Sequence, residues 1–365
     1  MKKKILISAL SFHMGDFIWA ASALAIIKKT YPEIKITVII PKSLKDLAID
    51  NPVIDDVIFS LYSSQSFISR LKQISWNLKN IPRIFFSRYD ACIILAQSKL
   101  TVMLAKICRI PRIVGADLCL SSDKVDVFSK HYTDIIKMFP NQTKLHVSMR
   151  FQNIVKSFFG IYNNALPVLP SPDKFAESAK KFIISDEKLN IALCMSGNKN
   201  KGNLSLKEWK IEDCAKFIKT LNSKFNARFY FLGVSVDAHK VQEISSLSKE
   251  CEVHNLCGKT SIGDALCILQ KNDLCISVDT GILHLAAASN IPVIALHGPT
   301  SPQRTGGMSW KVKSLYHIVD CSCDSDIAKA KKHCLISEKI KCMEAITPDE
   351  IMDQAVKILN KLDKK

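Results

Sequence analysis

The residues best suited to chemistry lie between positions 275 and 307. A short apolar run rich in β-branched side chains predicts a buried strand. Asp279-Thr280-Gly281 follows it at the expected start of a helix, with His284 in the first turn, and a second apolar run ends at the rigid loop Gly298-Pro299-Thr300-Ser301-Pro302. A helix N-terminus offers unpaired N–H groups and partial positive charge. The pattern therefore favours a phosphate or diphosphate ligand; the alternative is an ordinary βαβ unit with a capped helix.

A carboxylate stands at a comparable place near the start of the chain. Asp16 ends the loop 11–16, which follows the first expected strand and precedes a helix. A carboxylate there can act as a general base that removes the proton of an attacking hydroxyl. Its alternative role is to cap the helix N-terminus.

Two lysines and a further aspartate follow expected strands in the second half. Lys199 and Lys201 lie in a loop rich in Gly and Asn, where a cation can stabilise a developing diphosphate leaving group. A solvated surface loop is the alternative. Asp237 comes shortly after Gly233 at a strand end, which suits a carboxylate that accepts ribose hydroxyls.

The elements that must position these residues alternate along the chain. Strands are expected at 4–9, 36–40, 53–59, 89–96, 190–195, 228–232, 253–256, 274–278 and 293–296. Helices are expected at 17–30, 43–50, 99–108, 145–159, 211–222, 236–249, 261–270, 282–289 and 351–362. Such alternation predicts an α/β chain with parallel sheets, and the Pro- and Asn-rich segment 162–172 marks a boundary between two domains. Ligands then bind at the carboxyl ends of the strands, in a cleft between the domains.

Composition indicates a globular protein with anionic partners. The 365 residues are 47% hydrophobic and 23% charged, and the formal net charge is +17. A positive charge of this size favours nucleic acid, an acidic membrane surface or a phosphorylated substrate. No signal peptide or transmembrane run is expected. The 13 cysteines, an odd number scattered mostly in apolar contexts, are typical of reduced thiols in a cytosolic protein.

The segment 57–116 combines basic and aromatic residues. Its only acidic residue is Asp90, against nine basic ones. Apolar rings among Lys and Arg suit the interface of an anionic membrane; the alternative is a basic solvated helix over a core that contains the rings. RNA binding would use similar residues, but no nucleic-acid motif accompanies them. The membrane or acceptor surface is predicted to include Arg70, Lys72, Trp76, Lys79, Arg83 and Arg88.

Four of the 13 cysteines lie close together near the C-terminus: Cys321, Cys323, Cys334 and Cys342. Thiols in such a cluster can bind Zn²⁺. Their spacing is not that of a standard zinc module, so reduced thiols are expected and no metal site is predicted.

The block from Asp279 to Pro302 resembles the signature of glycosyltransferase family 9, the bacterial lipopolysaccharide heptosyltransferases. The resemblance extends over essentially the whole chain. It includes Met14-Gly15-Asp16, Tyr89-Asp90, Ile113-Val114-Gly115, Ser196-Gly197 with a following lysine, and Cys342-Met343-x-x-Ile346-Thr347-Pro348. One departure concerns the loop after Ser196: the family often has Lys-x-Trp-Pro there, and at Lys201 this chain reads Lys-Gly-Asn-Leu-Ser. A second is Ala20-Ala21-Ser22, which stands where the family usually has a Pro in the first helix.

The resemblance implies a GT-B fold. Its two Rossmann-like domains would be an acceptor-binding domain at 1–165 and a nucleotide-sugar-binding domain at 166–346, followed by a C-terminal helix at 347–365. It also implies an inverting, metal-independent transfer without a cofactor, typically from ADP-heptose to the inner core of lipopolysaccharide. Asp16 would be the catalytic base. The expected donor-binding residues are Lys201 or Lys199, Asp237, Thr260, Asp279, Thr280, Gly281 and His284, and the expected phosphate and sugar loop contains Gly298, Thr300 and Ser301.

The leading hypothesis is therefore a sugar transferase that acts on an anionic, lipid-linked saccharide of the lipid A–core type. It would work in the cytoplasm, peripherally on the inner face of the inner membrane, and it would not bind nucleic acid. One alternative is a nucleotide-sugar epimerase or hydrolase of the same fold. Another is a nonenzymatic nucleotide-sugar binding protein.

Overall fold

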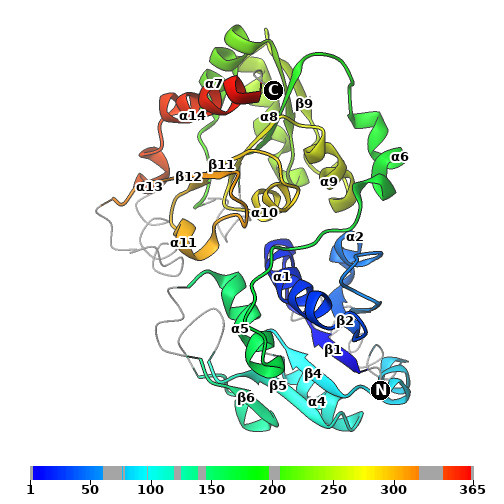
Figure 1. Cartoon of the computed structure of the whole chain (residues 1–365). Coiled ribbons are helices and arrows are strands. Elements are labelled where there is room, and N and C mark those ends of the chain that lie inside the picture. Colours follow the sequence, from blue (N-terminus) through cyan, green and yellow to red (C-terminus); the bar gives the residue numbers. More distant parts are fainter. Residues whose placement is uncertain are drawn as a thin grey trace. The chain divides into compact units, whose positions relative to one another are not determined.

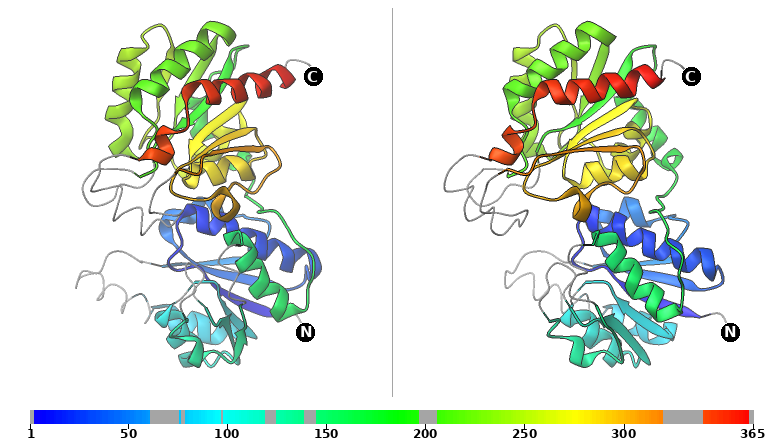
Figure 2. Two further views of the ribbon diagram at one scale, coloured as in Figure 1. Left: turned by 90° about the vertical axis from the view of Figure 1, so that its left-hand side faces the viewer. Right: turned by 60° about the vertical axis from the view of Figure 1, so that its left-hand side comes forward.

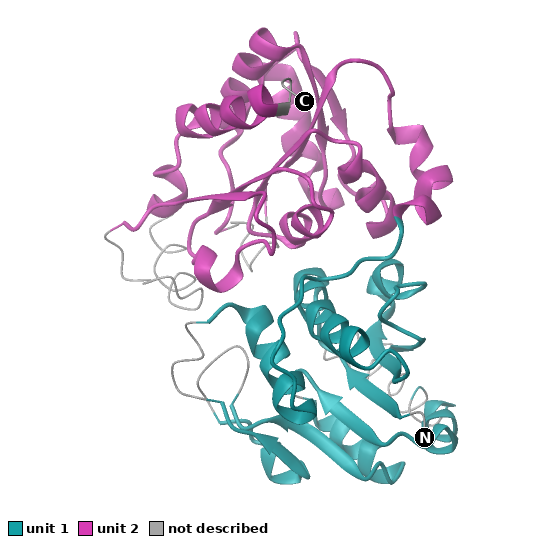
Figure 3. Ribbon diagram, viewed as in Figure 1, with its two compact units in different colours: residues 1–171 teal, residues 172–365 magenta. Residues whose placement is uncertain are grey.

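The computed structural model describes residues 3–60, 76, 79–96, 98–118, 125–138, 145–196, 206–319 and 340–362. The chain forms two compact units, residues 1–171 and 172–365 (Figure 3). The division falls at the end of the Pro-rich segment, slightly later than the sequence predicts. The expected separate C-terminal helix, α14 (Pro348–Leu362), packs on α7 (Ile211–Phe225) and so belongs to the second unit.

The first unit is built on a parallel six-stranded sheet in the order β3-β2-β1-β4-β5-β6. The strands are β1 (Lys4–Ser8), β2 (Lys35–Pro41), β3 (Asp56–Ser60), β4 (Ala91–Ile94), β5 (Arg112–Ala116) and β6 (Asp134–Ile136). The order reverses between β1 and β4, which are neighbours in space although β2 and β3 separate them in sequence. Loops at the carboxyl ends of these two strands therefore flank the usual ligand position of such a sheet.

Helices cover both faces of this sheet. α1 (Met14–Thr30) and α5 (Val147–Phe159) pack against each other (Figure 1), and Gln152 Nε2 donates to Ser22 Oγ at 2.9 Å between them. The other face, which contains Leu6 and Cys92, packs on α4 (Lys99–Ile107) and on the helical residues 79–87. Short helices complete the unit: η1 (Lys42–Leu44), α2 (Lys45–Ala48) and η2 (Ser129–His131).

The second unit repeats the plan with the strand order β12-β11-β10-β7-β8-β9, again all parallel. The strands are β7 (Leu189–Cys194), β8 (Ala227–Phe231), β9 (Glu252–Asn255), β10 (Leu274–Val278), β11 (Val293–His297) and β12 (Val312–Tyr316). Here the order reverses between β7 and β10. The loops after these two strands hold most of the residues that the sequence marks for donor binding.

Alternation along β10 decides which side chains can reach a ligand. Ile276 and Val278 point into the core shared with α7 and α14, whose ribbons lie beside each other in Figure 2. Ser277 and Asp279 alternate with these two residues, so their side chains point to the opposite face of the sheet, toward α10 (Gly281–Ala288).

The remaining helical segments of the second unit are η4 (Pro172–Phe175), α6 (Ala176–Ala179), η5 (Lys180–Phe182), η6 (Ser235–Asp237), α8 (Ala238–Leu247), α9 (Ile262–Gln270), α11 (Pro302–Thr305) and α13 (Lys341–Glu344).

Within the described ranges, none of the helices combines the length and the apolar character that a membrane crossing requires.

Candidate functional site

A buried carboxylate organises the carboxyl edge of the second sheet. Asp279 follows β10 and is only 5% exposed. Its Oδ2 accepts three hydrogen bonds, from Lys207 Nζ at 2.8 Å, Thr300 Oγ1 at 2.5 Å and Thr305 Oγ1 at 3.1 Å. Lys207 Nζ also donates to the backbone oxygen of Asp279 at 3.0 Å. Asp279 therefore ties the loop after β7 to the loop after β11.

His284 completes this group from α10. Its Nε2 lies 3.4 Å from Asp279 Oδ1, and its side chain is almost fully buried. Burial by itself raises the pKa of Asp279, but the positive charge of Lys207 and the hydrogen bond from His284 outweigh it and hold the pKa well below its usual value. The carboxylate is therefore charged at neutral pH, and it keeps the ammonium group of Lys207 at the strand ends.

The N-terminus of α10 borders the same group. Thr280 is the N-cap residue in an extended conformation, but its side chain does not cap the helix. Its Oγ1 lies instead 3.4 Å from Ser277 Oγ and 3.5 Å from Cys194 Sγ. The first-turn N–H groups of α10, beginning at Gly281, thus face the edge at which Lys207 supplies a positive charge. The arrangement suits a phosphate group.

The loop after β11 is held by packing beneath it. A Cβ atom on Gly298 would overlap the Sδ atom of Met343, so only glycine fits without a shift of that side chain. Thr300 is bonded to Asp279 as described, and Ser301 Oγ donates to Gln303 Oε1 at 2.6 Å. His297, the last residue of β11, is fully buried, and burial lowers its pKa to about 4. It is neutral at pH 7.

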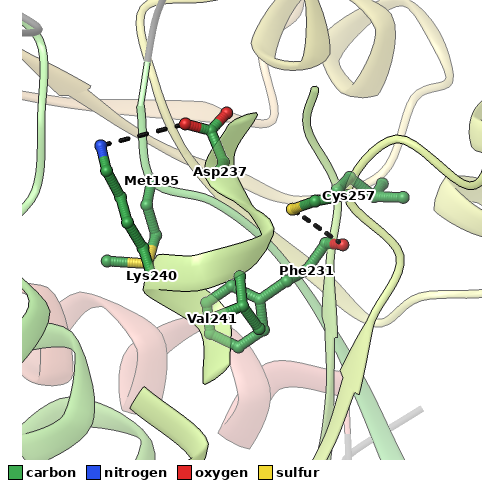
Figure 4. Close-up of a pocket in the computed structure, with 7 residues that line it drawn as sticks. Met195, Phe231, Asp237, Lys240, Val241 and Cys257 are labelled. Atoms are coloured by element: carbon green, nitrogen blue, oxygen red, sulfur yellow. Dashed lines mark hydrogen bonds and ion pairs between the residues drawn. The ribbon is translucent and has the colours of Figure 1, made fainter. Parts of the chain in front are cut away.

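A second polar group lies after β7 and β8. Asp237 Oδ1 accepts from Ser196 Oγ at 2.5 Å and lies 3.9 Å from Lys240 Nζ, which pairs with Glu208 Oε1 at 2.5 Å. These contacts adjoin a small pocket (Figure 4), lined by Met195, Phe231, Leu232, Asp237, Lys240, Val241 and Cys257. Thr260, predicted to bind near the adenine, is half-buried just before α9 and outside this lining.

The structure adds a lysine that the sequence interpretation missed. The predicted lysines Lys199 and Lys201 lie outside the described residues, whereas Lys207 is paired with Asp279. Lys207-Glu208-Trp209 supplies the Lys-x-Trp part of the family pattern, with Lys210 in place of Pro. The pattern is therefore present, a few residues after Lys201. That signal was available in the sequence.

Asp16 lies in the first turn of α1, at the carboxyl end of β1. Its Oδ2 accepts from the backbone N–H of His13 at 3.1 Å, which stabilises the helix N-terminus. The carboxylate is partly exposed. Capping, the alternative role, is thus observed.

One residue predicted on the membrane or acceptor surface lies in the core instead. Trp76 is 6% exposed, packs with Ile84 and Cys108, and donates from Nε1 to the backbone oxygen of Phe59. Arg83 pairs with Asp56 at 2.7 Å. Lys79 and Arg88 are exposed, and Arg70 and Lys72 lie outside the described residues.

The cysteine cluster falls mostly outside the described residues. Cys321, Cys323 and Cys334 are not among them, and Cys342 is a buried free thiol. Across the part of the chain that the structure describes, no three His, Cys, Asp or Glu side chains are grouped so as to hold a metal ion.

Two parallel sheets in which the strand order reverses, with polar side chains at the carboxyl ends of the strands, are typical of nucleotide-binding α/β proteins. The chain matches the model of glycosyltransferase family 9 (heptosyltransferase) over residues 87–335, and it belongs to this family.

Similar proteins agree with this membership. Lipooligosaccharide heptosyltransferase 2 of Haemophilus ducreyi is 24% identical, with 98% of this chain and 99% of that protein aligned. The Haemophilus influenzae protein of the same name is 32% identical, but the match spans only 29% of this chain and 30% of that protein.

Solved structures confirm the predicted GT-B fold. A glycosyltransferase family 9 protein from Veillonella parvula superposes with a TM-score of 0.80 at 20% identity, covering 99% of this chain and 98% of that one. ADP-heptose lps heptosyltransferase II of E. coli gives 0.76 at 18% identity and covers 99% of both chains.

Proposed function

We propose that the protein transfers a heptose from ADP-heptose to an inner-core saccharide of lipopolysaccharide. Family membership and the names of the relatives support a heptosyltransferase, and the E. coli structural neighbour is an ADP-heptose enzyme. The observation that carries the proposal is the Lys207–Asp279 pair beside the open N-terminus of α10. It combines a fixed cation with free N–H groups, which is what a diphosphate requires.

Lys207 binds the donor diphosphate and stabilises the negative charge that develops on it as the sugar leaves. Thr280 and Gly281 supply backbone donors to the phosphates. Asp279 acts mainly through Lys207, since its Oδ2 already accepts three hydrogen bonds. Lys199 or Lys201 can add a second cation from the same loop.

We expect further donor contacts from the residues around this pair. His284 holds Asp279 and lies next to the sugar, and the loop at Gly298, Thr300 and Ser301 closes the phosphate side. Asp237 receives the ribose hydroxyls at the pocket edge, and Thr260 lies toward the adenine. Ser196 Oγ donates to Oδ1 of Asp237, so Oδ2 is the oxygen that we expect to accept from the ribose.

Asp16 acts as the base on the acceptor. It takes the proton of the acceptor hydroxyl as that oxygen forms a bond to the anomeric carbon, and the bond from the anomeric carbon to the phosphate oxygen breaks. ADP departs with the electron pair. Attack opposite to the leaving group inverts the anomeric configuration. Lys207 and the α10 N-terminus supply the positive charge, so the transfer needs neither metal nor cofactor.

The acceptor is an anionic lipid-linked saccharide, so the enzyme works in the cytoplasm, peripherally on the inner membrane face. The positive net charge of +17 supports this placement.

The test combines a donor panel with acceptor dependence. Binding of ADP-heptose, ADP-glucose and UDP-glucose is measured calorimetrically, and ADP release is followed with and without a lipid A–core acceptor. We expect preference for ADP-heptose and ADP release only with acceptor. Sugar-nucleotide turnover without acceptor would instead indicate a hydrolase or epimerase, and binding without any turnover would indicate a binding protein.

A further inference from the structure

The outer face of α4 has an unusual composition. Its exposed side chains are Lys99, Met103, Lys106 and Ile107, and the two apolar ones, one turn apart, are 50% and 52% exposed. The stripe contains no acidic residue. Alternating long cations and large apolar side chains on one helix face are typical of helices that lie in a membrane interface.

The helical residues 79–87 extend this face. Phe85 and Phe86 are 41% and 77% exposed, and their rings contact each other edge to face at 5.4 Å. Cys108, directly after α4, donates from Sγ to the backbone oxygen of Ile81 at 3.7 Å. The two helices therefore lie side by side on one face of the first sheet. Four large apolar side chains are exposed over this pair of helices.

The charge around these apolar residues is almost entirely positive. Arg88 and Arg109 are exposed in the loops that follow the two helices. Between residues 79 and 112 the only acidic residue is Asp90, and its Oδ2 is occupied by the backbone N–H of Lys4 at 2.7 Å. The cations are exposed, and Lys106 Nζ also lies 3.3 Å from His131 Nδ1. An exposed apolar cluster bordered by cations is complementary to a bilayer, which is apolar inside and anionic at its surface.

We propose that Phe85, Phe86, Met103 and Ile107, with Lys106 and Arg109, form a basic-apolar face that seats the first unit on an anionic lipid bilayer. The rings and Met103 enter the headgroup region, and the cations pair with lipid phosphates. The inference rests on the proposed function in one respect: a lipid-linked acceptor would explain why the enzyme binds a bilayer. This face differs from the surface predicted from the sequence, because Trp76 is buried and Arg83 is paired with Asp56.

The fold places this face on one side of the first sheet. α4 runs along the sheet, and Thr101 in its first turn shares a hydrogen bond with Ser8, the last residue of β1, at 2.7 Å. Phe85 and Phe86 come just before β4 begins, and Ile107 and Arg109 just before β5 begins. The proposed face therefore lies toward the amino ends of these strands, away from the carboxyl edge that carries Asp16.

Vesicle co-sedimentation of the full chain tests the proposal. Vesicles of phosphatidylcholine alone are compared with vesicles containing 30% phosphatidylglycerol, at low and high salt. We expect strong binding only to the anionic vesicles, weakened by salt. Phe86→Ser, and Phe85→Ser with Phe86→Ser, should each lower the partition coefficient about tenfold or more. Lys106→Glu with Arg109→Glu should lower it to a similar extent.

The matched control is Trp310→Ser, which removes an 84% exposed aromatic ring from the second unit. Its vesicle binding should equal that of the unchanged protein. Equal binding by the Phe86 and Trp310 variants, or negligible binding to anionic vesicles, would overturn the proposal. So would a dimer in light scattering that the Phe86 change dissociates, because the face would then bind a second copy.

Vesicle binding is separable from catalysis. The Phe85 and Phe86 changes should leave ADP release with a lipid-free core saccharide unaltered, because these residues lie near the amino end of β4, away from the carboxyl ends of the strands. Vesicle binding without any heptosyl transfer would refute the proposed function but not the membrane-binding role of the basic-apolar face. Heptosyl transfer without vesicle binding would refute only that membrane-binding role.

Discussion

The Nζ atom of Lys207 lies 2.8 Å from Oδ2 of Asp279, and the two residues come from loops 72 residues apart in the chain. The carboxylate side chain is 4% exposed and the lysine side chain 20%. The pair fixes a cation at the point where the strand order reverses, next to the N-terminus of α10. We expect this pair to contribute separately to stability and to donor binding.

Removing either partner should destabilise the second unit. Asp279→Asn leaves the Lys207 ammonium without its carboxylate and should cost about 3 kcal/mol of unfolding free energy, while Lys207→Met leaves a buried carboxylate. The double variant should lose less than the sum, with a coupling above about 1 kcal/mol by denaturant unfolding. The control is Asp349→Asn at the exposed pair with Lys216, expected to change stability by less than about 1 kcal/mol. Strict additivity would contradict a coupled pair.

Lys207→Met should also weaken ADP-heptose binding by roughly 10- to 100-fold, since a charge-assisted contact to the diphosphate is lost. Lys210→Met is the matched control, because that lysine is exposed and pairs with Glu344 at 3.1 Å. Titration calorimetry measures both. Unchanged ADP-heptose affinity in the Lys207 variant would indicate that Lys199 or Lys201, and not Lys207, contacts the diphosphate.

Burial of His297 should make stability depend on pH. Its folded pKa of about 4 lies below the ordinary value of 6.5, so between these values the unfolded chain binds more protons than the folded one. Stability from the neutral imidazole is therefore present above about pH 6.5 and is lost as pH falls toward 4. Between pH 7.5 and 5 the loss should be about 2 kcal/mol.

His297→Phe should remove this part of the pH dependence, measured by denaturant unfolding at pH 7.5, 6 and 5. The exposed His239 on α8 is the control position, and His239→Gln should retain the slope of the unchanged protein. Parallel pH curves for the His297 variant and the unchanged protein would refute the assignment.

Asp16 should be required for transfer but not for folding. Asp16→Asn keeps an oxygen that can accept the His13 N–H bond, so stability should change by less than about 1 kcal/mol. The amide cannot take a proton from the acceptor, and the rate should fall by at least about 100-fold. ADP-heptose affinity, measured separately, should be retained. Near-normal turnover would remove Asp16 from the role of base.

Gly298 should be intolerant of a side chain because of Met343. Gly298→Ala should destabilise by roughly 1–3 kcal/mol through overpacking, and it should also disturb the Thr300 contact to Asp279. Met343→Ala in the same chain makes room for the new methyl group and should recover part of the loss. Thermal unfolding of the two single variants and the double variant checks this; no recovery would mean that the loop is limited by something other than Met343.

Periodicity predicted most elements well, including the edge strands β3 and β9, and it failed at the opposite edge of each sheet. β6 has three residues and β12 has partly exposed ones, so neither contains the apolar run that identifies a buried strand. Edge strands pack on fewer neighbours, and their sequences are correspondingly less constrained. The central strands β7, β10 and β11 are apolar and were predicted to within a residue or two.

Trp76 illustrates a different limit. Aromatic and basic residues alternate around it in the sequence, and the pattern fits either a membrane-facing or a core-facing ring. Packing of residues 79–87 against α4 decided the matter, because it turned Trp76 and Ile84 inward and left Phe85 and Phe86 outside.

The sequence by itself determined the α/β class, the two-unit division near the Pro-rich segment and the block from Asp279 to Pro302, because these depend on local propensity, periodicity and short-range spacing. The tertiary structure alone decided that Lys207 is the partner of Asp279, that Met343 requires glycine at position 298, and that four apolar side chains meet on one outer face. Those relationships join residues distant in the chain, and contacts of that kind exist only after the parallel strands have assembled.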